Sequence, residues 1–122
     1  MPREKLFLQD IIEAANAIEG FLDNVMKSDF LQSDLIQSAV LQKLAIIGEA
    51  SARVSDELRN THTEIPWKQI IGFRNIAIDA YFSINWEIVW VAATQNAPAL
   101  REQVKEILQD EFPNFDLRGK TK

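Results

Sequence analysis

Apolar residues in the first half of the chain recur every three or four positions, which is the spacing of one face of an α-helix. In residues 3–27 this stripe consists of Leu8, Ile11, Ile12, Ala15, Ile18, Leu22 and Val25. In residues 34–60 it consists of Ile36, Val40, Leu44, Ile47, Ala50 or Ser51, Val54 and Leu58. A polar break lies between the two runs, from Ser28 to Asp34. The pattern therefore predicts two long antiparallel helices, the second capped by Ser33 or Asp34.

The second half of the chain predicts three shorter helices. Pro66 suits the first turn of one that runs to about residue 80 or 82, because proline has no N–H to leave unpaired there. Asn85 then caps a helix over residues 86–95, and Pro98 opens a helix over residues 99–111. No stretch alternates apolar and polar residues with a period of two. We expect an all-α, up-and-down bundle of about five helices in one domain, residues 1–111, with a polar tail over residues 112–122.

Gly48 interrupts the second predicted helix, inside Ile46-Ile47-Gly48-Glu49-Ala50. A glycine in a helix interior costs about 1 kcal/mol relative to alanine. We therefore expect a neighbouring helix to approach the backbone closely at this position.

Composition excludes several classes of protein and site. The chain has no cysteine and one histidine, His62, so disulfides, thiolate metal sites and histidine-rich metal centres are excluded. No apolar run approaches the roughly 20 residues of a membrane span, and the first residues lack the apolar core of a signal peptide. A cytoplasmic location is expected. The net charge of −5 argues against a broad basic face that coats nucleic acid, but it leaves room for a local basic cleft.

One apolar segment, residues 73–84, contains a cation, an amide, a carboxylate and a phenol close together: Arg74, Asn75, Asp79 and Tyr81. The planar guanidinium suits a phosphate, and an asparagine can hold a ribose or phosphate oxygen. A tyrosine can stack on a base or accept a modification. A group at position 79 can act as general base on a ribose hydroxyl. These residue types predict a site for phosphodiester chemistry or for a nucleotide.

The spacing of these residues bears on how the site is assembled. At about 100° per residue, Asn75 and Asp79 share a helix face, whereas Arg74 and Asp79 lie about 140° apart. Convergence of the latter two needs a bend, the reach of the arginine, or a second copy of the chain. We expect a homodimer with a composite site. The alternative for Arg74 and Asp79 is a structural ion pair that locks a helix end.

Other polar residues have a functional and a structural interpretation. Lys43 and Arg53 are candidates to bind RNA substrate, although a solvated helix face is the commoner explanation for such charges. Glu49 either lines the cleft or is a buried, hydrogen-bonded glutamate. His62 lies in a polar turn and is expected to be exposed. Core or dimer contacts are expected for the three tryptophans: Trp67, Trp86 and Trp90.

The central stretch resembles the Arg-x4-His-x-Tyr motif of HEPN ribonuclease toxins of the HepT group. The matching residues are Arg74, Asn75, Asp79, Ala80 and Tyr81. The flanking segments also fit, and the resemblance covers about residues 5–110: Lys43-Leu44-Ala45-Ile46-Ile47-Gly48-Glu49-Ala50, Ile65-Pro66-Trp67, Gly72-Phe73-Arg74-Asn75, and Trp90 followed by Pro98 and Leu100.

The resemblance implies a small helical toxin that dimerises and cuts RNA, often tRNA, without a metal or other cofactor. It implies a partner, a minimal nucleotidyltransferase (MNT) antitoxin, which silences the toxin by transferring AMP from ATP to the motif tyrosine. On this basis Arg74 is the catalytic, phosphate-binding arginine and Asn75 is a polar helper. Tyr81 is the AMPylation acceptor, and Asp79 occupies the position of the catalytic histidine.

Aspartate at position 79 departs from the family motif. The ordinary pKa falls from about 6.5 for histidine to about 3.9 for aspartate, so Asp79 can accept a proton but is a poor acid at neutral pH. Three interpretations remain open: a working variant base, a natural pseudoenzyme, or an introduced change that makes a toxic protein expressible. The alternative functions are a catalytically silent binding partner of the nucleotidyltransferase and a helical scaffold without chemistry.

Overall fold

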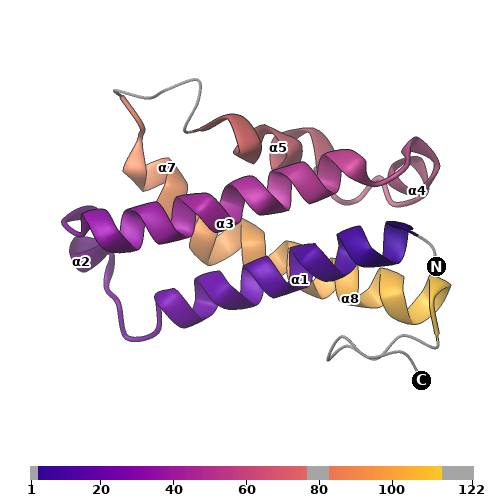
Figure 1. Ribbon diagram of the computed structural model, residues 1–122, viewed down its shortest axis with the longest axis horizontal. Helices are drawn as coiled ribbons and strands as arrows, with labels where there is room; N and C mark the ends of the chain where they lie inside the picture. The colour runs from indigo at the N-terminus through magenta and orange to yellow at the C-terminus, as the bar shows by residue number, and fades with distance from the viewer. Residues whose placement is uncertain (1–2, 77–82, 114–122) are drawn as a thin grey trace.

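The computed structural model describes residues 3–76 and 83–113, and within these ranges the chain forms helices and no strand. The all-α prediction is therefore confirmed. Three elements form the body of the molecule: α1 (Arg3–Phe21), α3 (Asp34–Arg53) and α8 (Ala97–Glu111). α1 packs against both α3 and α8 and runs antiparallel to them (Figure 1).

The core between these helices contains the two predicted apolar stripes. Its fully buried side chains come from all three long helices and include Leu8, Ile11, Ile18, Val40, Leu44, Ile47, Leu100 and Leu108. Burying one such side chain contributes roughly 1.5–3 kcal/mol, so this core supplies most of the stability.

The connection from α1 to α3 differs from the prediction. α1 ends at Phe21 rather than near Lys27, and Asn24 has a left-handed backbone with φ of 59°. A short helix, α2 (Lys27–Leu31), lies in the predicted polar break. Asp29 caps it by accepting a hydrogen bond of 3.1 Å from the backbone N–H of Met26. Asparagine tolerates the left-handed conformation better than most residues, which explains why the chain turns here.

α2 also places an aromatic anchor in the core. Phe30 is fully buried, and its ring packs against Trp86 and Trp90 with centroids 6.2 Å and 5.3 Å away. These contacts confirm a packing role for the two tryptophans. They attach α2, which precedes the start of α3, to the segment that leads into α8.

The predicted helix over residues 34–60 is two helices, α3 and α4 (Asp56–Thr61). The break is at Ser55, whose side chain caps α4 by accepting a hydrogen bond from the N–H of Leu58. The N–H and hydroxyl of Ser55 both donate to the carboxylate of Glu4 in α1, with distances of 3.1 Å and 2.7 Å. A contact across 51 residues of sequence therefore ends α3, and helical periodicity alone cannot reveal it.

His62, which caps the C-terminus of α4, is not the exposed residue that the sequence predicted. Its side chain is 17% exposed, and its ring nitrogens contact the carboxylates of Glu111 at the end of α8 and of Glu64, the latter at 3.5 Å. Its carbonyl also accepts a hydrogen bond of 2.9 Å from the indole of the buried Trp67. His62 therefore joins α4, the start of α5 (Trp67–Gly72) and the end of α8.

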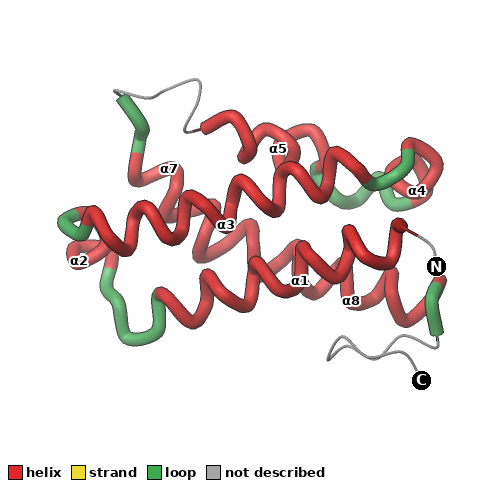
Figure 2. Tube along the Cα trace, viewed as in Figure 1, coloured by secondary structure: helices red, strands yellow, loops and turns green. Residues whose placement is uncertain are grey.

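The last two predicted helices form one uninterrupted helical run (Figure 2). α7 (Trp86–Val91) is capped by Asn85, as predicted, and leads through a π-helical turn, η2 (Ala92–Asn96), into α8. Pro98 lies in the first turn of α8 and does not break the run. The wider π turn is where the chain accommodates the missing N–H. None of the described helices is long and apolar enough to cross a membrane.

Candidate functional site

The candidate site begins at the contact between α3 and the short turn that follows α5, η1 (Phe73–Asn75). The backbones touch at Gly48. A Cβ atom added there would lie 2.6 Å from the backbone nitrogen of Arg74 and 3.0 Å from the carbonyl oxygen of Ile71. Only glycine fits without displacing η1, so the predicted close approach is confirmed. The close contact fixes the backbone from which the Arg74 side chain projects.

A glutamate beside this contact holds two arginines. Oε2 of Glu49 lies 3.5 Å from Nη1 of Arg74, and Oε1 accepts a hydrogen bond of 3.1 Å from Nε of Arg53. We call Arg53, Glu49 and Arg74 the arginine–glutamate cluster. All three residues are exposed, so Glu49 is neither buried nor remote from the site. Its exposure excludes the buried alternative for Glu49, and its contacts place Arg53 near Arg74.

Arg74 is held loosely. Its side chain is 41% exposed, and its distance to Glu49 is at the long limit of a hydrogen bond. Exposed ion pairs of this kind contribute about 0–1 kcal/mol. A guanidinium has five N–H donors in a planar fork, and this contact uses one of them. The remaining donors suit an oxyanion such as a phosphate.

The other predicted residues are placed as follows. Asn75 is exposed in η1, next to Arg74, and lines a hollow of about 320 Å³ with Ile76 and Ile88. Lys43 lies on α3 about 120° round the helix axis from Glu49, and within the described residues no hydrogen bond or ion pair joins it to the cluster. Asp79 and Tyr81 lie outside the described residues, and so does the predicted pairing of Arg74 with Asp79.

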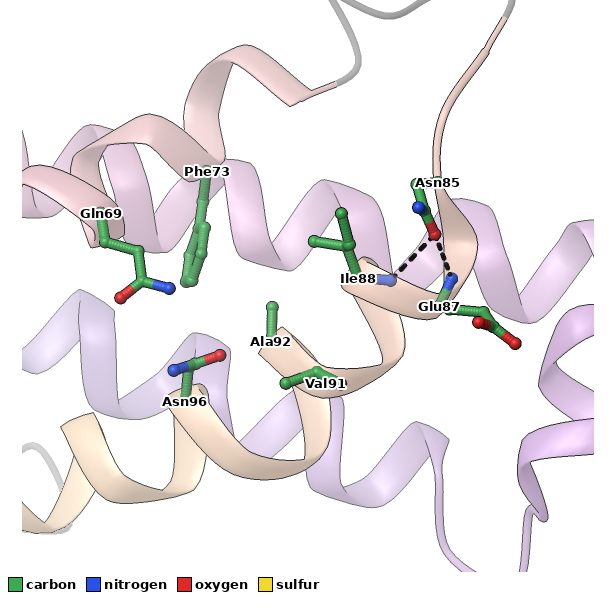
Figure 3. A pocket seen from close by; sticks show the side chains of 8 residues that line it. All are labelled: Gln69, Phe73, Asn85, Glu87, Ile88, Val91, Ala92 and Asn96. Atoms are coloured by element: carbon green, nitrogen blue, oxygen red, sulfur yellow. Dashed lines mark hydrogen bonds between the residues drawn. The ribbon is translucent and has the colours of Figure 1, made fainter.

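A second hollow, of about 310 Å³, lies between η1 and the start of the C-terminal helical run (Figure 3). Phe73 points into it, opposite Ile88, Val91 and Ala92. Ile88 is 61% exposed and Val91 is 43% exposed, which is unusual for side chains of this size. The turn that carries Arg74 therefore borders an open apolar surface rather than a closed core.

Within residues 3–76 and 83–113, no group of three histidine, cysteine or acidic residues is placed to hold a metal ion. The chemical groups present at the cluster are two guanidiniums, one carboxylate and the neighbouring amide of Asn75. They can bind a phosphate and stabilise negative charge on it.

The partner of Arg74 is the feature that sequence reasoning missed. The two residues are 25 positions apart, and no periodicity links α3 to η1. A signal was nevertheless present, because a helix-interior glycine marks a close backbone contact and the next residue flanks it. Gly48 followed by Glu49 therefore indicates a carboxylate at the edge of that contact.

Comparison with known proteins gave consistent matches. Residues 11–107 match the family model of HepT-like ribonucleases. A protein of Thermococcus cleftensis named "probable ribonuclease HepT" is 34% identical over 103 residues, which cover 84% of this chain and 94% of that protein. A Methanocaldococcus jannaschii protein named "putative RNase" is 35% identical over 101 residues, 83% of this chain and 93% of its own. No solved structure gave a significant match.

Proposed function

The chain belongs to the HepT-like ribonuclease family, and on this premise we propose that it is an endoribonuclease whose Arg74 binds the scissile phosphate of RNA. The observation that carries the proposal is the arginine–glutamate cluster. Gly48 fixes the backbone of Arg74, while Glu49 holds its side chain by one long contact that uses one of the five guanidinium donors. A guanidinium that is accessible to solvent and projects from a fixed backbone position is well placed to bind a phosphate.

The proposed reaction needs a base, a cation and no metal. The ribose 2′ oxygen attacks the adjacent phosphorus, the new P–O2′ bond forms and the P–O5′ bond breaks. The products are a 2′,3′-cyclic phosphate and a 5′ hydroxyl. Asp79 takes the proton of the 2′ hydroxyl, and water supplies the proton to the leaving oxygen. Arg74 stabilises the charge that grows on the phosphoryl oxygens, with Asn75 as a polar helper and Lys43 and Arg53 along the RNA.

We also propose that the active form is a homodimer with a composite site. Two observations support it: the open apolar hollow around Phe73, Ile88 and Val91 borders the Arg74 turn, and Arg74 and Asp79 do not converge on one straight helix. A second copy that covers this hollow brings its own cluster nearby. The test is sedimentation of Ile88→Glu, which is expected to shift the protein to monomer and reduce cleavage.

The biological role proposed is the toxin of a toxin–antitoxin pair, with tRNA as substrate. The partner is a nucleotidyltransferase that joins the phenol oxygen of Tyr81 to the α-phosphorus of ATP and releases pyrophosphate. Mass spectrometry after incubation with that partner and ATP tests this proposal. A gain of AMP that is absent in Tyr81→Phe supports it, and modification of Tyr81→Phe identifies a different acceptor.

Cleavage itself is tested with purified protein, tRNA and EDTA. Discrete fragments are expected from the natural chain and none from Arg74→Ala. Cleavage by Asp79→His alone would show that the present sequence is a disabled form. If neither the natural chain nor Asp79→His cuts any RNA, the endoribonuclease proposal is wrong.

The second candidate function is a catalytically silent partner of the nucleotidyltransferase. Asp79 favours it, because a carboxylate with an ordinary pKa of about 3.9 is an anion at neutral pH and repels the substrate phosphate. AMP transfer to Tyr81 without RNA cleavage by the natural chain would support this function over the first.

A further inference from the structure

A third hollow lies beside the arginine–glutamate cluster, between α1 and α3. Its volume is about 290 Å³, and its lining residues come from two helices: Phe7 and Asp10 from α1, and Ile46, Glu49, Ala50 and Arg53 from α3. Ligand pockets of this size are at the lower end of the usual range. The hollow suits one planar ring better than an oligonucleotide. It shares Glu49 and Arg53 with the cluster, so an occupant lies next to the proposed phosphate site.

The walls combine apolar surface with polar groups at the edge. Phe7 is half-buried, and Ile46 is 37% exposed. Single-stranded RNA is commonly recognised by stacking of a base on an aromatic ring or an arginine plane, with hydrogen bonds to the edge of the base. Both components are present here, because Phe7 supplies a ring and Arg53 supplies a guanidinium.

The polar edge selects among bases. Asp10 and Glu49 are hydrogen-bond acceptors when ionised, and both oxygens of Glu49 are already occupied by arginines. Asp10 is the carboxylate left for a ligand. Partial burial, and then the neighbouring charge of Glu13, raise its pKa. A ligand with N–H donors can bind this carboxylate at the edge of the hollow.

We propose that this hollow is a subsite for one base of the RNA substrate, next to the phosphate held by Arg74, and that Asp10 makes it prefer guanine. This inference rests on the proposed ribonuclease function. Guanine presents two adjacent N–H donors on one edge, which match the two oxygens of a carboxylate. Uracil presents one N–H between two carbonyl oxygens, which a carboxylate repels. Adenine and cytosine each place a single donor beside an acceptor and are expected to rank between them.

The experiment is an NMR titration of the ¹⁵N-labelled full chain with 5′-GMP and, separately, with 5′-UMP. The chemical shifts of the backbone amides are measured at each ligand concentration. The two ligands carry the same ribose and phosphate, so a difference between them reports on the base. We expect the shifts to concentrate at Phe7, Asp10 and Ala50. We expect GMP to bind at least about fivefold more tightly, the lower bound for a well-formed two-point contact to a base.

Two variants separate a specific contact from general charge. Asp10→Asn is expected to remove the preference for GMP. Asp110→Asn, which removes the same charge from an exposed position on α8, is expected to retain it. Equal affinity for GMP and UMP would overturn the proposal. Shifts that cluster away from the hollow, or an unchanged preference in Asp10→Asn, would also overturn it.

Failure of this proposal is distinguishable from failure of the proposed function. If Arg74-dependent cleavage occurs but GMP does not bind in the hollow, the subsite is wrong and the ribonuclease function stands. If GMP binds there with the expected preference while neither the natural chain nor Asp79→His cuts RNA, the subsite stands and the ribonuclease function is wrong.

Discussion

Two junctions in this molecule each depend on an arginine, and the two arginines are held in different ways. At the junction of α1 with α8, Arg101 is 14% exposed and donates to Glu19 at 2.8 Å, to Asn16 at 3.1 Å and to Glu102 at 3.0 Å. The hydrogen bond to Glu19 is the main cause of its raised pKa. At the junction of α3 with η1, Arg74 is 41% exposed, and its one ion pair among residues 3–76 and 83–113 is with Glu49, at 3.5 Å.

The difference separates an arginine that serves the fold from one that is available to a ligand. Three hydrogen bonds from Nε and Nη1 hold Arg101 to partners in the protein, so its side chain is fixed and largely buried. The backbone of Arg74 is fixed by its close contact with Gly48, whereas its side chain is partly exposed and is held by Glu49 through a single nitrogen at 3.5 Å. Rigid placement with unused donors is the condition for binding a phosphate without a large reorganisation.

The largest expected effect is on cleavage by Arg74→Ala. Removing one group that stabilises transition-state charge commonly costs about 10²–10³-fold in rate, and we expect a loss of at least that size. The free energy of unfolding should change by less than about 1 kcal/mol, because the lost ion pair is exposed. Cleavage rates and urea denaturation measure the two quantities. Arg59→Ala, which removes a cation from α4, serves as control and should cleave RNA at the natural rate.

The converse result is expected for Arg101→Ala. A hydrogen bond to a charged group contributes about 1.5–3 kcal/mol net of solvent, and the partner carboxylates of Glu19 and Glu102 are exposed and are not left buried and unpaired, so we expect a destabilisation of about 2 kcal/mol. Cleavage per folded molecule should not change. Lys105→Ala, one turn further along α8, removes an ion pair of 3.5 Å and should cost less than about 0.5 kcal/mol. If Arg101→Ala abolished cleavage in folded protein, the two junctions would not be functionally distinct.

Adding one methyl group at the α3–η1 junction tests how Arg74 is placed. Gly48→Ala puts a Cβ atom 2.6 Å from the backbone of Arg74, and overpacking of this kind costs about 1–3 kcal/mol. We expect lower stability and slower cleavage together. Gly20→Ala in α1 is the matched control, because no atom lies within 4 Å of its added Cβ. It should stabilise the protein by roughly 0.5–1 kcal/mol and leave cleavage unchanged.

The smallest expected effect is on the pH dependence of stability, and it concerns two carboxylates whose pKa values shift in opposite directions. A hydrogen bond from Arg101 lowers the pKa of Glu102, whereas crowding and Glu13 raise the pKa of Asp10. A raised folded pKa means that ionisation opposes folding. The penalty is absent below the ordinary pKa of 3.8 and complete above the raised value. Asp10→Asn should therefore gain stability relative to the natural chain as pH rises through that window.

This gain should stay below about 0.5 kcal/mol at neutral pH, because solvent screens a largely exposed carboxyl. Urea denaturation at several pH values measures it. Glu13→Gln removes the charge of Glu13 but leaves the partial burial of Asp10. Its stability at each pH should therefore lie between that of the natural chain and that of Asp10→Asn. A loss of stability in Asp10→Asn above that window would contradict the assignment.

Sequence patterns predicted the parts of the fold that depend on local chemistry. The apolar stripes of α1 and α3, the Asn85 cap and the close approach at Gly48 follow from residue type and spacing, and the structure confirms them. The break between α3 and α4 depends on a contact between Glu4 and Ser55, and the run from α7 into α8 depends on a π turn. Neither depends on periodicity, so neither was predicted.

The candidate site likewise contains residues that local sequence chemistry identifies and contacts that only the packing of helices determines. Arg74 was identified from its own chemistry and from its unusual setting in an apolar segment. Its partner Glu49 was not, because that contact depends on how α3 packs against η1. The functional roles of Asp79 and Tyr81 remain predictions, since both residues lie outside the described residues.

The most direct measurement is the salt dependence of RNA binding by Arg74→Ala and by Arg101→Ala, compared with the natural chain. Single-stranded 2′-O-methyl RNA is the ligand, because its blocked hydroxyl prevents cleavage. Each lost phosphate contact should reduce the slope of log K against log salt by about 0.7. We predict this reduction, together with weaker binding, for Arg74→Ala and an unchanged slope for Arg101→Ala. An unchanged affinity and slope for Arg74→Ala would contradict the claim that Arg74 binds an RNA phosphate.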